Sequence, residues 1–441
     1  MLKPNARQYY DIIITGGGMV GSVLACKLAK TLSAYKPSIL MIEGGPSKLW
    51  ESELSKNDRP FSNRVSAINN STKHLLQSID IWDTVSNKCK NVNEMKVWGN
   101  GSKNIGTVFT AENEGDNLAY IVENDILIAA AMNSMSKYEN LEIMHNSQAK
   151  NFKLPDNEED GVSLTANDNI QLECNLLLGT DGANSKVRQA MGTQYISWDY
   201  KQRGIVATLK LSQNGENDIA WQKFLCTGPI ALLPLDRTTS SLVWTTTPEQ
   251  ANFLLSLTEE SFVDALNSAL WEEPVTDKLN ENVTQAVSSL LKKMNIDEKR
   301  QELTPPTIVD VVEGSRASFP LGFGHAVSYI SRNVALVGDA AHRVHPLAGQ
   351  GVNLGFGDVA CLSDVLARYA SYGAKYGDYK ALQEYETIRQ RSIIPKLIGI
   401  DLIQKVAGHQ WSPLLALTNV AMQITNAATP LKKLLIKSAA V

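Results

Sequence analysis

A glycine-rich turn near the start of the chain has the residue types and spacing that bind phosphate groups. Asp11–Thr15 is an apolar run typical of a buried strand, the segment GGGMVG follows it, and Ser22–Lys30 has a helical pattern. In such a unit Gly16 permits the tight turn, Gly18 lets a pyrophosphate approach the backbone, and Gly21 lets helix and strand pack closely. The N-terminus of the helix then offers unpaired N–H groups to the phosphates.

A second predicted strand, Ser38–Ile42, ends at Glu43, which follows Gly21 by 22 residues. This is close to the gap of about 20 residues expected for the acid that binds a ribose 2′-hydroxyl. A carboxylate there would repel a 2′-phosphate, so NADP is disfavoured. The alternative is a glycine-rich turn without a ligand. Strand, helix and acid together favour a dinucleotide site, which on these residues alone can hold FAD or NAD.

A third segment distinguishes the two cofactors. The apolar strand Val334–Val337 ends at Gly338 and Asp339. The Asp339 carboxylate is placed where it could bind the ribityl hydroxyls of a flavin, and NAD has no ribityl chain. FAD is therefore the predicted cofactor.

The segment that follows has a glycine- and amide-rich composition and leads into a predicted helix. Its candidate cofactor-binding residues are Gly349, Gln350, Gly351 and Asn353. The N-terminus of this helix could face the flavin pyrimidine edge, where the helix dipole would stabilise the negative charge of reduced flavin. The alternative is a glycine-rich surface loop, which is less expected beside a dinucleotide site.

A middle segment pairs Asp181 and Gly182 with Ser185 and Arg188, after the predicted strand Leu176–Leu178. Taken alone, an Asp-Gly pair after a strand is ordinary turn chemistry. Its position between the two other motifs makes it a candidate for the middle of the same FAD molecule.

Together these motifs resemble the single-component flavoprotein aromatic hydroxylases, the group that includes para-hydroxybenzoate hydroxylase. The segments Ser62–Ile68, Tyr120–Asn124 and Gly338–Gly351 are similar to the ubiquinone-biosynthesis hydroxylases of this group. Three more segments resemble their eukaryotic mitochondrial branch: Ala220–Leu225, Gly228–Leu235 and Ser241–Trp244. The resemblance extends from about Tyr10 to about Lys433.

The resemblance implies an FAD-dependent monooxygenase that hydroxylates a polyprenylated 4-hydroxybenzoate-derived ring, with carbon 5 as the expected position, through a flavin 4a-hydroperoxide. Molecular oxygen would be a substrate, and electrons would come from a ferredoxin and its reductase or from NAD(P)H. The resemblance also implies other proteins of a ubiquinone-biosynthesis complex and a peripheral position on the matrix face of the mitochondrial inner membrane. No transit peptide is evident in the ten residues before the first strand.

The resemblance also implies roles for four single residues. Arg64 would lie against the FAD pyrophosphate or ribityl chain, and Asn124 near the adenosine and the flavin chain. His345 and Pro346 would be neighbours of the flavin ring and are the candidate catalytic residues. Because a histidine beside a turn more often bonds the backbone, we do not predict His345 as a general base.

Composition excludes several other classes of protein. The net charge of −4 and the pI of about 6.0 argue against nucleic acid as a partner. The five cysteines are odd in number and scattered, which favours free thiols and no metal site.

The predicted fold class is α/β, a Rossmann-like FAD-binding domain of the para-hydroxybenzoate hydroxylase type. An inserted antiparallel sheet forms the predicted substrate domain, and helices follow. The FAD-binding domain is predicted over 8–75, 115–190 and 305–370, the substrate domain over 76–114 and 191–304, and a C-terminal helical region over 371–441. The predicted strands of the inserted sheet are Gly204–Leu211, Ala220–Leu225, Pro229–Pro234 and Ser241–Thr247.

Three questions stay open on the sequence. The runs Ile230–Leu235 and Leu242–Thr246 can be walls of an apolar substrate channel or a sheet face packed on its own core. The C-terminal helices can pack on the core or touch a membrane surface. The chain can also be a flavin oxidoreductase that inserts no oxygen, or a scaffold, although a scaffold has no need of FAD-specific groups.

Overall fold

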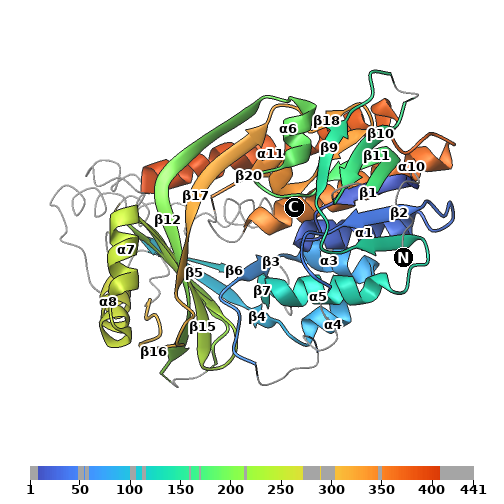
Figure 1. The fold of residues 1–441 in the computed structure, drawn as a ribbon. Helices are drawn as coiled ribbons and strands as arrows, with labels where there is room; N and C mark the ends of the chain where they lie inside the picture. Colours follow the sequence, from blue (N-terminus) through green and yellow to red (C-terminus); the bar gives the residue numbers. More distant parts are fainter. Residues whose placement is uncertain are drawn as a thin grey trace.

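The computed structural model describes residues 8–47, 54, 59–99, 106–111, 116–157, 160–167, 170–212, 216–271, 289, 303–345 and 350–407. Within these ranges the strands form three sheets of eight, nine and three strands (Figure 1). The two larger sheets occupy opposite sides of the molecule, and the small sheet lies against the nine-stranded one.

The eight-stranded sheet contains the glycine-rich turn. Its strands are β1 (Gln8–Thr15), β2 (Ile39–Ile42), β8 (Leu141–Met144), β9 (Ala149–Lys153), β10 (Val162–Ala166), β11 (Ile170–Gly179), β18 (Ile330–Ser331) and β19 (Val334–Leu336). The main path runs β18-β19-β11-β1-β2-β8, and the pairs from β19 to β8 are parallel. Ile12, Ile13 and Ile14 of β1 are fully buried. Parallel strands covered by helices on both faces need such continuous apolar runs.

Four helices pack on and beside this sheet: α1 (Met19–Thr31), α5 (Asn124–Met135), α10 (Gln350–Ser371) and α11 (Tyr379–Ala407). Helix α1 contacts α5 and α10, and α10 contacts α11. A short helix, α6 (Lys186–Met191), follows β11, and the 3₁₀ helix η1 (Gly338–Ala340) follows β19. Most turns relevant to the site therefore lie at the carboxyl ends of parallel strands.

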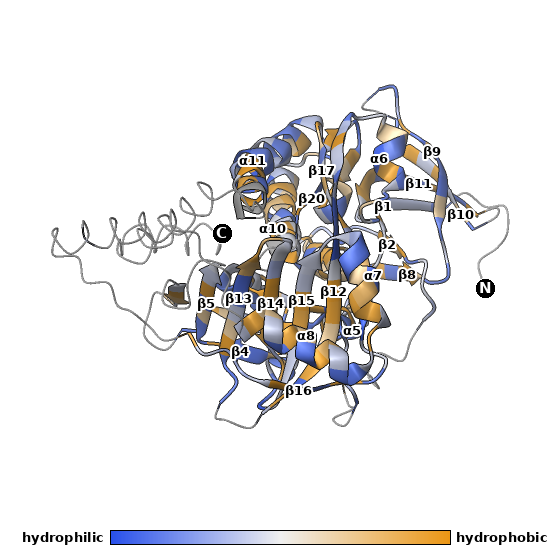
Figure 2. Cartoon of the chain, turned by 90° about the vertical axis from the view of Figure 1, so that its left-hand side faces the viewer, coloured by the Kyte–Doolittle hydropathy of each residue, from blue (hydrophilic) through white to orange (hydrophobic). Residues whose placement is uncertain are grey.

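The nine-stranded sheet is antiparallel except where β13 pairs with β5. Its strands are β5 (Glu94–Gly99), β6 (Gly106–Thr110), β12 (Tyr195–Leu211), β13 (Ile219–Leu225), β14 (Gly228–Pro234), β15 (Thr239–Thr246), β16 (Ile308–Val311), β17 (Ala317–Ala326) and β20 (His342–Arg343). Helices α7 (Pro248–Ser256) and α8 (Glu259–Trp271) lie beside it, and Figure 2 shows hydrophobic positions along the strands next to α8.

The small sheet, ordered β3-β7-β4, joins the two halves of the molecule. It consists of β3 (Val65–Ile68), β4 (Lys90–Val92) and β7 (Ala119–Glu123), and two helices accompany it, α3 (Asn70–Ser78) and α4 (Trp82–Ser86). Val92 and Ile121 pack against Ala220 and Leu235 of the nine-stranded side. Both β3 and α3 contact α10 on the other side.

The predicted α/β class with an inserted antiparallel sheet is confirmed, and all four predicted strands of that sheet are present. Strand β12 begins at Tyr195, nine residues before the predicted start at Gly204. Its first part is largely exposed, with charged residues at Asp199 and Lys201, and it is held by pairing with β17. A buried strand is predicted from its apolar run, and this exposed ribbon has none. Its strand conformation is instead held by the hydrogen bonds to β17.

The alternation of side chains along β14 and β15 shows which residues of the two candidate channel walls pack in the core. Ile230, Leu232, Leu242 and Trp244 pack in one core with Phe262 of α8. Their side chains therefore stabilise the sheet and cannot line a channel. The intervening positions point to the opposite face, because successive side chains of a strand alternate.

Parts of several predictions fall outside the described residues. These include Pro346, Gly349 and residues 408–441 of the predicted C-terminal helical region. Helix α11 continues through Pro395, where the sequence favours a break. Pro395 has no N–H to donate to the carbonyl of Arg391, and both residues are exposed.

The domain boundaries stay a prediction. Strands β16, β17 and β20, which belong to the 305–370 segment, pair within the nine-stranded sheet. Among the described helices, none combines the length and the apolar character that crossing a membrane requires.

Candidate functional site

Two glycines of the first turn are required by the fold itself. Gly16 has φ of +99°, and a Cβ atom there would lie 2.6 Å from the carbonyl oxygen of Thr180. A Cβ at Gly21 would collide with the carbonyl oxygen of Gly16. Thr180 also donates its hydroxyl to the carbonyl of Gly16 at 2.7 Å. Both positions thus bring β1, α1 and the end of β11 into close contact.

Gly18 differs, because the space beside it is open. It is the N-cap of α1 with φ of −65°, and a Cβ built on it meets no atom of the described residues within 4 Å. Since any residue could adopt this φ, neither backbone strain nor packing explains a glycine here. Gly18 also has no side chain with which to cap the first turn of α1, so N–H groups remain available to an anion.

Glu43 lies immediately after β2, and its carboxylate holds the glycine turn. Gly17 donates its N–H to Oε2 at 2.5 Å, and Gly45 donates to Oε1 at 2.7 Å. Each carboxylate oxygen can accept a further hydrogen bond. Glu43 therefore supports the turn and keeps acceptor capacity for a hydroxyl, whereas the sequence predicted the second role alone.

Asp181 and Gly182 follow β11 directly beside this turn. Asp181 Oδ2 accepts from the N–H groups of Lys186 and Val187, at 2.7 and 3.3 Å, at the start of α6. Its other oxygen, Oδ1, is buried and has no hydrogen-bond partner among the described residues. Buried polar atoms without a partner are rare, and one facing a proposed binding site suggests a missing ligand or water.

The Gly338–Asp339 pair reaches the same place from β19. Gly338 has φ of +65°, and a Cβ there would lie 3.2 Å from the side chain of Val20, which follows the glycine turn. Asp339 is exposed, yet desolvation raises the pKa of its carboxyl above the ordinary value, although His342 and Arg343 oppose this. A carboxylate that is accessible while surrounded by protein atoms fits a concave site. Three sequence motifs thus converge around the start of α1.

Arg64, Asn124 and Asn353 form a second group around β3. The backbone N–H of Asn124 donates to the carbonyl of Arg64 at 3.0 Å, and Ser66 donates its hydroxyl to Asn124 Oδ1 at 2.7 Å. Asn353 donates to the carbonyl of Ala67 at 2.8 Å. Its Oδ1 also accepts from two groups at the start of α3. The structure therefore shows Asn353 joining α10 to the small sheet.

The remaining predicted residues surround the start of α10. His345 is fully buried, and neither ring nitrogen has a hydrogen-bond partner among the described residues. Burial lowers its pKa to about 4, so the ring is neutral at pH 7. Gln350 and Gly351 are the first residues of α10.

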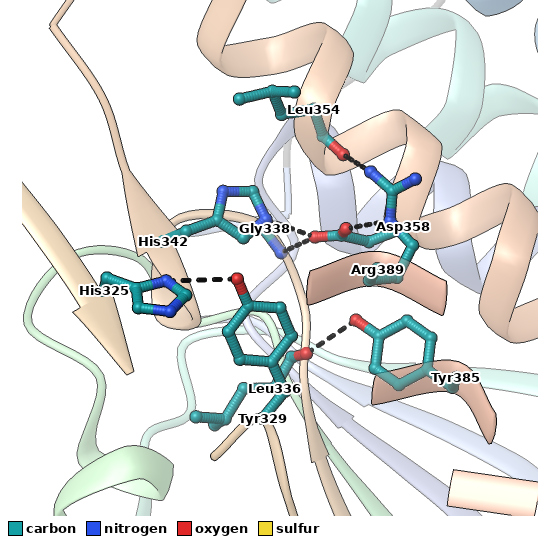
Figure 3. Close-up of polar contacts among 9 residues, drawn as sticks. All are labelled: His325, Tyr329, Leu336, Gly338, His342, Leu354, Asp358, Tyr385 and Arg389. Carbon is teal, nitrogen blue, oxygen red and sulfur yellow. Dashed lines mark hydrogen bonds and ion pairs between the residues drawn. The ribbon is translucent and has the colours of Figure 1, made fainter. Parts of the chain in front are cut away.

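A buried polar network behind this site was not predicted (Figure 3). Asp358 of α10 accepts from the N–H of Gly338 at 2.8 Å, lies 2.7 Å from His342 Nε2, and accepts from Arg389 Nε at 2.7 Å. Burial raises the pKa of Asp358, but attraction by His342 and Arg389 outweighs it and holds the pKa below its ordinary value. Tyr385 donates to the carbonyl of Leu336 at 2.8 Å.

This network fixes the loop that carries Asp339 from two helices at once. The sequence alone does not predict this network, because Arg389 lies 31 residues after Asp358 on a different helix and matches no motif. A charged residue inside an otherwise apolar helical run was the available signal.

Comparison with known proteins assigns this site to a class. The family model described as the FAD binding domain matches residues 9–298 and 292–393. Two crystal structures show the same fold at low sequence identity. A probable FAD-dependent monooxygenase from Pseudomonas aeruginosa, PqsL, has a TM-score of 0.67 at 18% identity and covers 94% of this chain and 100% of its own. The p-nitrophenol 4-monooxygenase PnpA from Pseudomonas putida has a TM-score of 0.66 at 15% identity, with 99% of each chain covered.

Curated relatives narrow the class. The mitochondrial ubiquinone biosynthesis monooxygenase COQ6 of Xenopus tropicalis is 42% identical over 437 residues, covering 96% of this chain and 92% of the relative. The human protein of the same name is 41% identical over 434 residues, with 96% and 91% covered. The chain belongs to the FAD-binding family and, within it, to the ubiquinone biosynthesis monooxygenases COQ6.

The residues present fit FAD. The uncapped start of α1 beside Gly18 offers donors to a pyrophosphate. Glu43 keeps acceptor capacity for a ribose, and both the unpartnered Oδ1 of Asp181 and the accessible carboxylate of Asp339 can accept from hydroxyl groups. The individual contacts remain predictions, but the set of donors and acceptors matches the charge and the hydroxyl groups of this cofactor.

Gly18→Val should separate cofactor binding from folding. The added side chain enters open space, so we expect the urea unfolding midpoint to stay close to that of the wild type. The same side chain would occupy the path of the pyrophosphate, and FAD should bind at least about tenfold more weakly, a loss of about 1.4 kcal/mol or more. Flavin absorbance after gel filtration measures this. Gly21→Ala is the contrasting variant, since its clash should destabilise the fold by about 1–3 kcal/mol. Normal flavin content in Gly18→Val would contradict the assignment.

Arg389→Met should be strongly destabilising. It leaves Asp358 buried with its opposite charge removed, which costs about 3–5 kcal/mol in comparable pairs. Arg391→Met, on the exposed side of the same helix, should change the free energy of unfolding by less than about 0.5 kcal/mol. Urea denaturation at pH 7 compares the two. Equal stabilities would show that the network does not support the loop.

His345 should make the protein acid-sensitive. The folded state binds this proton only below about pH 4, whereas the ordinary histidine pKa of 6.5 applies to the unfolded chain. The unfolded state therefore holds more protons between these values, and the contribution of His345 to stability, about 3 kcal/mol, is lost as the pH falls from 6.5 to 4. His345→Phe should remove this part of the pH dependence. Identical slopes for variant and wild type would contradict it.

Proposed function

We propose that this chain is an FAD-dependent monooxygenase that hydroxylates a polyprenylated 4-hydroxybenzoate-derived ring in ubiquinone biosynthesis, with carbon 5 as the ring position. The observation that carries this proposal is the convergence of the three FAD motifs around the start of α1, in a chain 40–42% identical to vertebrate COQ6 proteins over nearly its whole length. Bound FAD would supply the electron transfer and the activation of oxygen.

The protein's own residues would supply position and charge. Gly18 and the start of α1 would bind the pyrophosphate, Glu43 the adenosine ribose, and Asp339 the ribityl hydroxyls. Asp181 and Gly182 would contact the middle of the cofactor. The N-terminus of α10, with Gly349, Gln350 and Gly351, would stabilise negative charge on the reduced ring.

The second group of residues would complete the enclosure. Arg64 has an exposed side chain and would lie along the pyrophosphate or ribityl chain, with Asn124 beside it. Asn353 would act mainly by fixing α10 to β3. His345 and Pro346 would be neighbours of the flavin ring. Exclusion of water is required here, because reduced flavin that reacts with oxygen in water releases hydrogen peroxide unproductively.

The mitochondrial relatives support the location, and the partners are part of the proposal. We infer a mitochondrial protein whose electron donor is a ferredoxin with its reductase or NAD(P)H. Association with other proteins of ubiquinone synthesis and a peripheral position on the matrix face of the inner membrane are parts of the same proposal. Ile394, Ile398 and Leu402 of α11 are exposed at helical spacing and are candidates for such a contact.

One experiment tests function and donor together. The purified holoprotein is mixed without oxygen with NADH, with NADPH, or with a ferredoxin and its reductase, and loss of flavin absorbance is followed. Air and a prenylated 4-hydroxybenzoate are then added, and the products are identified by mass spectrometry. We expect rapid reduction by one donor and a product heavier by one oxygen atom. Reduction without a hydroxylated product would instead favour a flavin oxidoreductase that inserts no oxygen.

A further inference from the structure

His345 has hydrogen-bonding capacity that the protein does not use. The residue follows β20 and has no exposed surface, and both Nδ1 and Nε2 lack a partner in the described part of the chain. A neutral imidazole has one N–H donor and one nitrogen acceptor. Leaving both unmet inside a protein is costly, so a group from outside the chain is expected to meet them.

The ring of His345 is oriented by an aromatic contact. Tyr200 of β12 packs edge-on against it, with ring centroids 5.2 Å apart and an interplanar angle of 79°. The Tyr200 hydroxyl donates to Asp401 Oδ1 of α11 at 3.1 Å. Burial raises the pKa of Tyr200, and Asp401 raises it further, so the hydroxyl keeps its proton. The contact with Tyr200 is between the two rings, so it orients the imidazole without using the hydrogen-bonding capacity of either nitrogen.

Apolar surface continues from this point on both supporting elements. Ile196 and Trp198 alternate with Tyr200 along β12, so the three share one face of the strand. The side chains of Ile196 and Trp198 are 44% and 38% exposed. The ring of Trp198 stacks on that of Phe323 in β17, with the ring centroids 3.9 Å apart. Ile398, three residues before Asp401 on α11, is 63% exposed. A polar, buried end and an exposed apolar approach together fit an amphiphilic ligand.

The chemistry of the imidazole favours a hydroxyl. A neutral histidine both donates and accepts, and a hydroxyl group does the same, so one phenol can use either ring nitrogen. With a pKa of about 4, His345 is far too weak a base to remove the proton of a phenol, whose pKa is about 10. Its role would therefore be to position the ring and not to accept its proton.

We propose that His345 hydrogen-bonds the ring hydroxyl of the phenolic substrate and that Tyr200, held by Asp401, sets the orientation of the imidazole. The apolar chain of the substrate would extend toward Ile196, Trp198 and Ile398. This assignment rests on the proposed function, since it takes the phenol from it. It makes His345 a determinant of specificity for a free ring hydroxyl.

Paired probes test the assignment. The FAD-loaded protein is titrated with 3-prenyl-4-hydroxybenzoate and with the same molecule methylated on the ring oxygen, and binding is followed by the flavin absorbance change. The ether can no longer donate, so wild type should bind it about tenfold more weakly than the phenol. His345→Phe keeps the aromatic packing but has no hydrogen-bonding nitrogen, so its affinities for the two probes should differ by less than about threefold. His345→Gln, which keeps a donor and an acceptor, should restore part of the preference.

The controls separate the possible failures. The same substitution at exposed His74 of α3 should leave the preference unchanged. The flavin content of His345→Phe is measured in parallel, because His345 is also a proposed neighbour of the flavin ring. Loss of FAD from this variant would assign His345 to the cofactor, and a preserved tenfold preference would also overturn the proposal. If wild type bound neither probe, the proposed function would fail and this assignment with it.

Discussion

The carboxylate of Asp358 is the contact on which the geometry of the site depends. It is fully buried and accepts from Gly338 and Arg389 while lying against His342, so it joins the loop after β19 to two helices. A buried charge cannot lose a partner without a large cost, which makes these distances stiff. The next residue along the loop is Asp339, whose carboxylate is accessible. The acid proposed to bind the ribityl hydroxyls is therefore positioned from behind by α11, an element that carries no FAD motif.

Residues of the glycine turn were largely predictable, because their requirements are local. The strand-turn-helix pattern predicts both Gly16 and Gly21, because Gly16 has a positive φ and a Cβ at Gly21 would collide with the carbonyl oxygen of Gly16. Glu43 was predicted for a ribose, but its hydrogen bonds to Gly17 and Gly45 depend on how β2 lies beside β1, which no spacing rule contains. The pairing of Asp358 with Arg389 was beyond prediction for the same reason, since it arises where two helices cross. The start of β12 was missed because its order comes from β17.

Residues that belong to the same kind of motif differ in whether their hydrogen-bonding atoms already have partners within the protein. Asn353 belongs to the same segment as the residues proposed to lie at the flavin ring, yet its amide bonds the backbone of Ala67 and Asn69 and the hydroxyl of Thr72. Asp181 and His345, in contrast, keep buried polar atoms that have no hydrogen-bond partner among the described residues. The first arrangement holds the fold together. The second leaves specific directions in which a cofactor or a phenol can bond, and this distinction could not be drawn from residue types.

The order of the strands also has a consequence for how the chain is made. β1 is the first strand, yet its neighbours are β2 and β11, and β11 in turn pairs with β19, more than 300 residues after β1. During synthesis β1 cannot pair with its second neighbour, β11, until residue 179 has been made. Strand β11 in turn cannot pair with β19 until residue 336 has been made. Contacts this distant in sequence form slowly and leave strand edges exposed meanwhile. The nascent chain therefore cannot complete this sheet until about three quarters of its residues, through Leu336, have been synthesised.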